Sequence, residues 1–152
     1  EGLSFETTIT SDCAPLHEMV DQLLSAGIDV HCLRDLTRGG LASALNELAV
    51  SARVQMAIEE DSLPVIDEVR GACEILGLDP LYVANEGRLV ACVPAADADL
   101  ATEIMRGQAA GHAAAAVGTV LDKTPGLVTM KSRIGVDRVI DLLSGEQLPR
   151  IC

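Results

Sequence analysis

Apolar residues along this chain switch repeatedly between a helical and a strand-like spacing, and this pattern constrains the fold more than any other feature. Residues 12–26 carry apolar side chains three and four positions apart, which predicts an amphipathic helix capped by Ser11 or Asp12. Residues 28–33 predict a short strand, and a second helix is expected from Leu41 onward. Residues 54–59 alternate between large apolar residues and small or polar ones, which is typical of a half-buried strand.

The second half of the chain continues this alternation. A third helix is expected between Pro64 and Gly77, and the unbroken apolar run 89–93 predicts a central strand buried on both faces. Residues 96–110 predict a helix, residues 115–121 and 127–131 predict two strands, and residues 136–143 predict a final helix. This order of elements predicts an α/β (α+β) fold: a two-layer mixed β-sheet covered by helices.

Length and charge restrict the class of protein. A chain of 152 residues with 49% apolar residues can bury one full core. The net charge of −12 is spread along the chain, which disfavours nucleic acid or an anionic membrane as a partner. The sequence has no apolar run long enough to span a membrane and no charged-then-apolar leader, so we expect a soluble, cytoplasmic protein.

The two ends of the sequence differ from its middle. Residues 1–11 start without methionine and alternate between polar and apolar side chains, so we expect a strand or linker that arrives from a missing upstream domain. Residues 12–145 are expected to form the α/β domain, and residues 146–152 a flexible C-terminal tail. The sequence is therefore expected to be a fragment.

The five cysteines are odd in number and include no CxxC pair, so reduced thiols are expected. Cys73 and Cys92 lie in apolar runs and are expected in the core. The three histidines form no metal-binding motif, and no metal is expected to bind this chain alone. Cys152 is the last residue of the sequence, where no following backbone is expected to hold the thiol in a core. Two interpretations stay open: a reactive thiol that travels, or a cysteine that stands there by chance, since only Arg150 makes the tail electropositive.

Residues 35–40 and Glu86 are the other candidates for chemistry. The first segment joins a strand to a helix through two glycines and could receive a phosphate at the helix N-terminus, although glycine pairs also occur in turns without a ligand. Its candidate binding residues are Asp35, Thr37, Arg38, Gly39 and Gly40. Glu86 precedes the apolar run 89–93 and could act as a general base, unless Arg88 pairs with it and makes it inert.

Taken together, several segments resemble one known family. Residues 31–42, 44–47 and 84–88 and the ending Pro149-Arg150-Ile151-Cys152 resemble the [NiFe]-hydrogenase maturation factors of the HypE family, and residues 11–16 fit the same family. The glycine turns are shared with the wider PurM-like (aminoimidazole-ribonucleotide synthetase) superfamily, whereas the ending is specific to the maturation factors. The resemblance covers essentially the whole chain and corresponds to the second, C-terminal domain of such proteins.

The resemblance implies an ATP-dependent carbamoyl dehydratase. A partner carbamoyltransferase would place a carbamoyl group on Cys152, and ATP would drive loss of water to leave a thiocyanate, with Glu86 as the base. The cyanide would then pass to iron on a scaffold complex of maturation proteins. The missing first domain would carry most contacts to ATP and Mg²⁺ and the homodimer interface, while the turn 35–40 would line the nucleotide cleft.

Two alternatives remain beside this interpretation. In isolation the chain could be a non-catalytic docking module that presents its tail to partner proteins. It could also belong to another PurM-like ATP-dependent enzyme in which Cys152 is incidental.

Overall fold

The structure is a computed structural model that describes residues 9–142. Most of the expected linker 1–11 and all of the expected tail 146–152, including Cys152, therefore lie outside the described residues. Within the described part, no helix is long and apolar enough to cross a lipid bilayer.

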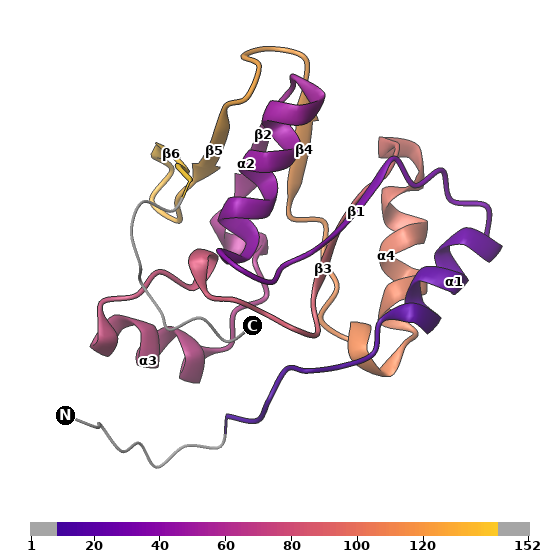
Figure 1. Cartoon of the computed structure of the whole chain (residues 1–152), viewed down its shortest axis with the longest axis horizontal. Coiled ribbons are helices and arrows are strands. Elements are labelled where there is room, and N and C mark those ends of the chain that lie inside the picture. Colours follow the sequence, from indigo (N-terminus) through magenta and orange to yellow (C-terminus); the bar gives the residue numbers. More distant parts are fainter. Residues whose placement is uncertain (1–8, 143–152) are drawn as a thin grey trace.

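The strands form two sheets. The larger sheet has the order β4 (Gly118–Leu121), β2 (Gln55–Glu59), β5 (Val128–Lys131), β6 (Asp137–Val139). In this sheet β2 and β5 run parallel, whereas β4 is antiparallel to β2 and β6 is antiparallel to β5. The smaller sheet pairs β1 (Cys32–Asp35) with β3 (Leu89–Cys92) in antiparallel register (Figure 1). The predicted mixed α/β fold is confirmed, with the strands divided between two sheets.

The described residues form four α-helices, of which α2 (Gly40–Ala52) packs on a sheet. Helix α2 lies on the larger sheet, and α1 (His17–Ser25) packs beside α4 (Ala98–Arg106) (Figure 1). Helix α3 (Asp67–Leu76) follows the larger sheet's β2 in the chain and contacts the short 3-10 turn η2 (Pro80–Tyr82). The main core is aliphatic and is made by α2, the larger sheet and η2: Ala42, Leu45, Ala49, Met56, Ile58, Leu81, Val128, Met130 and Ile140.

Helix α1 starts later than its apolar pattern predicts. It begins at His17, and its N-cap residue Leu16 makes no side-chain cap hydrogen bond. The expected cap Ser11 instead uses its Oγ to accept a hydrogen bond from the N–H of Cys13, at 3.2 Å. Pro15 explains why the helix does not extend back through Ala14, because a proline disfavours helical geometry in the residue before it.

The prediction of a central, doubly buried strand at residues 89–93 is wrong. Strand β3 belongs to the two-stranded sheet, and all four of its residues are half-buried. The central position is taken by β2, which lies between β4 and β5 and buries Met56 and Ile58. An apolar run alone does not distinguish a strand with two covered faces from one that lines a groove, which β3 does.

The predicted helix at residues 136–143 is also wrong over its described part. These residues enter β6, which pairs antiparallel with β5 after a turn in which the N–H of Gly135 donates to the carbonyl of Ser132. The helical spacing of Val136, Val139 and Ile140 is misleading, because only Ile140 is buried. Pairing with β5, the preceding strand in the chain, outweighs the helical spacing here.

The start of α2 packs tightly on the chain around η2. Gly39 and Gly40 have φ angles of 76° and 58°, a left-handed conformation that favours glycine. A Cβ on Gly40 would lie 2.5 Å from the carbonyl oxygen of Leu81 and 2.6 Å from that of Val83. Glycine at position 40 therefore lets α2 and the segment 81–83 come into backbone contact.

We predict that Gly40→Ala lowers the free energy of unfolding by about 2 kcal/mol or more, because left-handed strain adds to the steric clash. The matched control is Gly71→Ala in α3, where nothing lies within 4 Å of an added Cβ. That change should raise stability by about 0.5–1 kcal/mol. Urea unfolding measures both, and equal effects of the two changes would contradict the packing described for Gly40.

Candidate functional site

Two of the candidate segments meet at one end of the smaller sheet. Beyond the paired strands, the N–H of Leu36 donates to the carbonyl of Arg88 at 3.2 Å, and the N–H of Asn85 donates to the carbonyl of Leu36 at 2.8 Å. These bonds extend the β1–β3 pairing into the turn 35–40 and the turn 85–88. The structure thus brings the glycine turn and the segment that carries Glu86 side by side.

A third segment packs against the same place. A Cβ on Gly87 would lie 1.7 Å from the carbonyl oxygen of Asp12 and 2.8 Å from the nitrogen of Ala14. The Nε of Arg88 lies 4.0 Å from the Asp12 carboxylate. Arg88 therefore has its ion pair with Asp12 rather than with Glu86, the partner considered from sequence. Sequence spacing gave no signal for Asp12, because the contact joins distant parts of the chain.

The charged residues predicted for the site lie at the surface of these three packed segments. Glu86, Asp35 and Arg38 are exposed, and Thr37 is half-buried. Leu36, between them, is buried. The carboxylate of Glu86 is thus accessible in this chain, and its desolvation would have to come from another part of the protein or from a bound substrate.

The two glycines of the turn serve packing. A Cβ on Gly39 would meet the side chain of Ser43, at 2.0 Å from its Oγ, and Gly40 faces the carbonyls of the segment 81–83. Both positions thus require glycine for the packing of neighbouring protein atoms. What suits an anion at this turn is the positive end of the α2 dipole together with the Arg38 guanidinium.

A large groove begins at the three segments. It has a volume of about 770 Å³ and is lined mostly by apolar side chains, including those along β3 and β4. Its polar end is formed by residues of the site: Ser11, Asp12, Asn85, Gly87 and Arg88. A volume of this size is in the range of small-molecule sites in proteins.

The described cysteines differ in accessibility. Cys13 is exposed beside the site, whereas Cys73 is buried, which confirms its predicted place in the core. Burial, with a smaller effect of Asp79, raises the pKa of the Cys73 thiol. Cys92 is half-buried and packs against the main core, and burial, with a smaller effect of the opposite Cys32, raises its thiol pKa. Within residues 9–142, no group of three His, Cys, Asp or Glu side chains is placed to hold a metal ion.

The chain is similar to known proteins over most of its length. The family model described as "AIR synthase related protein, C-terminal domain" matches residues 2–131. The chain is 51% identical over 152 residues to a protein of Cupriavidus necator named carbamoyl dehydratase HypE, a match that covers all of the chain and 43% of that protein. The chain thus spans less than half the length of this relative.

Several solved structures are similar to the chain, and two of them bear on function. One is the hydrogenase maturation protein HypE in complex with ATP, with 40% identity and a TM-score of 0.92, covering 99% of the chain and 46% of that protein. The other is a HypE–HypF complex, with 40% identity and a TM-score of 0.87, covering 93% of the chain and 46% of the matched partner.

We predict that Cys13 is alkylated by iodoacetamide faster than Cys73 or Cys92 at neutral pH. A raised thiol pKa leaves less thiolate, the reactive form, and burial also blocks the reagent. The selectivity should narrow as the pH rises toward the raised pKa values. Peptide mass spectrometry over time measures the three rates, and equal rates in the folded protein would contradict the burial described here.

Proposed function

The chain belongs to the family of AIR synthase related C-terminal domains, and on this premise we propose that it is the C-terminal part of an ATP-dependent carbamoyl dehydratase that serves hydrogenase maturation. The observation that supports this most strongly is 51% identity to a carbamoyl dehydratase HypE over all 152 residues. The match includes the segment that ends in Cys152. We propose that this cysteine carries the carbamoyl group.

In the proposed reaction, a carbamoyl group is first transferred to the sulfur of Cys152, giving S–C(=O)–NH₂. The γ-phosphoryl group of ATP then moves to the carboxamide oxygen, because hydroxide is a poor leaving group and phosphate a good one. One N–H proton is released to water as the oxygen is phosphorylated, giving S–C(OPO₃²⁻)=NH and ADP. Glu86 accepts the second as the C–O bond breaks, which yields S–C≡N and phosphate.

The arrangement of the described residues supports Glu86 as the base. Its turn is held by backbone bonds to Leu36 and by the contact of Gly87 with residues 12–14. The carboxylate is exposed, so a thiol on a separate segment can approach it. A base must come within about 2.6–3.2 Å of the atom that loses the proton.

The neighbouring turn is proposed to face the nucleotide. The proposed nucleotide-binding residues are Asp35, Thr37, Arg38, Gly39 and Gly40, with Arg38 and the start of α2 suited to phosphate and the glycines shaping the turn. Most contacts to ATP and Mg²⁺ are proposed to come from the remainder of the whole protein. The ATP complex of the similar HypE protein supports nucleotide binding by the whole protein.

The proposed partners follow from the same reaction. A carbamoyltransferase supplies the carbamoyl group, which the HypE–HypF complex of a similar protein supports. A scaffold complex that holds the iron receives the cyanide, and the whole protein forms a homodimer in the cytoplasm. The surface position of Glu86, Asp35 and Arg38 favours a second candidate function for the isolated chain, that of a docking module without catalysis.

We predict the outcome of incubating the whole protein with the carbamoyltransferase, carbamoyl phosphate and ATP. Wild-type protein should carry a thiocyanate on Cys152, and Cys152→Ser should carry no modification at that residue. Glu86→Gln should accumulate the carbamoylated form or its O-phosphorylated derivative, with formation of thiocyanate at least about 100-fold slower because the base is lost. Peptide mass spectrometry of the C-terminal peptide measures each product.

The matched control is Glu74→Gln, which removes an exposed carboxylate on α3 and should dehydrate like the wild type. The isolated chain should show no dehydration and no ATP binding by calorimetry. An unmodified Cys152 in the wild-type mixture would exclude the carrier role. Dehydration by Glu86→Gln at the control rate would exclude Glu86 as the base.

A further inference from the structure

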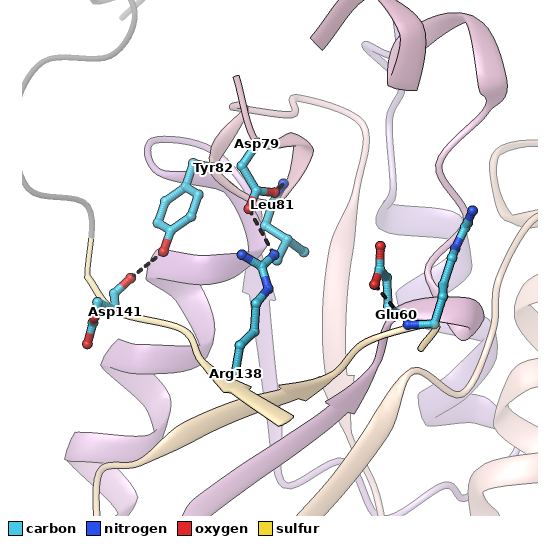
Figure 2. Close-up of polar contacts among 7 residues, drawn as sticks. Glu60, Asp79, Leu81, Tyr82, Arg138 and Asp141 are labelled. Carbon is cyan, nitrogen blue, oxygen red and sulfur yellow. Dashed lines mark hydrogen bonds and ion pairs between the residues drawn. The ribbon is translucent and has the colours of Figure 1, made fainter. Parts of the chain in front are cut away.

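Two side chains hold the backbone at the end of the described chain. The Nδ2 of Asn46 donates to the carbonyl of Ile140 at 2.9 Å. The hydroxyl of Tyr82 donates to the carbonyl of Asp141 at 2.9 Å (Figure 2). Ile140 is only 1% exposed, and its own N–H donates to the carbonyl of Val128. Residues 140 and 141 are thus fixed in position, directly before the segment that leads to Cys152.

The strand before this point is held to the same part of the fold. The guanidinium of Arg138 donates to the Asp79 carboxylate at 2.9 Å, and Asp79 accepts a hydrogen bond from the N–H of Leu81 (Figure 2). Asp79 is the N-cap residue of η2, which ends at Tyr82. The end of β6 and η2 are therefore joined by an ion pair and by the Tyr82 hydroxyl.

Both holding side chains are themselves firmly placed. Asn46 is a buried polar residue whose Nδ2 also donates to the carbonyl of Ala42, so its amide orientation is set within α2. The ring of Tyr82 packs against the main core. Burial, with the nearby Asp79, raises the pKa of the Tyr82 hydroxyl, so it keeps its proton and remains a donor near neutral pH.

These two residues also connect the end of the described chain to the candidate site. Asn46 lies on α2, the helix that starts at Gly40 in the glycine turn. Tyr82 lies in η2, shortly before the turn that carries Glu86, and α2 and η2 are in contact. Both hydrogen bonds go to backbone carbonyls, so they define the path of the chain whatever side chains stand at 140 and 141.

We propose that Asn46 and Tyr82 are positioning residues that fix the origin of the segment carrying Cys152 relative to Glu86. This inference rests on the proposed function. Cys152 lies eleven residues beyond Asp141, so its reach from a fixed origin is at most about 36–40 Å. Fixing the backbone at residues 140 and 141 limits the number of residues between the held part of the fold and Cys152. This limit sets the effective concentration of the modified sulfur at Glu86. Releasing residues 140 and 141 adds to that number and lowers the effective concentration.

The test compares Tyr82→Phe and the double variant Tyr82→Phe with Asn46→Ala in the whole protein. Hydrogen exchange of the peptide 138–143 should be faster than in the wild type, most of all in the double variant. In single-turnover experiments from the carbamoylated protein, dehydration should slow by about threefold to tenfold. Carbamoylation by the partner should stay within about twofold of the wild type, because the thiol reaches that site on another protein.

The matched control is Thr102→Val, which removes a side-chain hydroxyl that donates to the carbonyl of Ala98 within α4, away from residues 140 and 141. It should change neither the exchange of peptide 138–143 nor the dehydration rate. Unchanged exchange in the double variant, or faster exchange with unchanged dehydration, would overturn the inference. Failure of the proposed function is distinguishable, because Cys152 would then be unmodified in the wild type itself.

Discussion

The backbone hydrogen bonds between Leu36 and the segment 85–88 are the contacts on which the rest of the site depends. They continue the smaller sheet beyond its regular pairing and bring the start of α2 beside the turn that carries Glu86. Two glycines then allow neighbouring backbones to close around this point, Gly40 against the segment 81–83 and Gly87 against the segment 12–14. Backbone packing that tolerates no Cβ makes a frame with little freedom to shift.

Sequence patterns predicted the local parts of this arrangement. The junction between β1 and α2 could be placed because glycines mark a turn whatever lies around it. The pairing of one element with another could not be predicted. The spacing of Val136, Val139 and Ile140 suits a helix, yet antiparallel pairing with the preceding strand β5 decides the structure. The ion pair of Arg88 with Asp12 likewise joins segments whose sequences contain no sign of each other.

The buried residues of the site hold the backbone in place, and the exposed residues carry its charged groups. Leu36, Gly39 and Gly40 are buried and supply rigidity, while Asp35, Arg38 and Glu86 are exposed. The backbone of this surface is fixed in position, while its charged side chains are accessible. Such a surface can form one wall of a site that a nucleotide, a modified thiol and the rest of a larger protein complete. The hydrogen bonds of Asn46 and Tyr82 to residues 140 and 141 place the origin of the Cys152 segment in the same rigid unit.

In the proposed reaction, Glu86 accepts a proton from the carboxamide nitrogen on Cys152. The most direct measurement is a crystal structure of the whole protein with carbamoylated Cys152 and a non-hydrolysable ATP analogue. We expect a Glu86 carboxylate oxygen within about 2.6–3.2 Å of the carboxamide nitrogen. A different carboxylate at that distance, with Glu86 still facing solvent, would contradict the account.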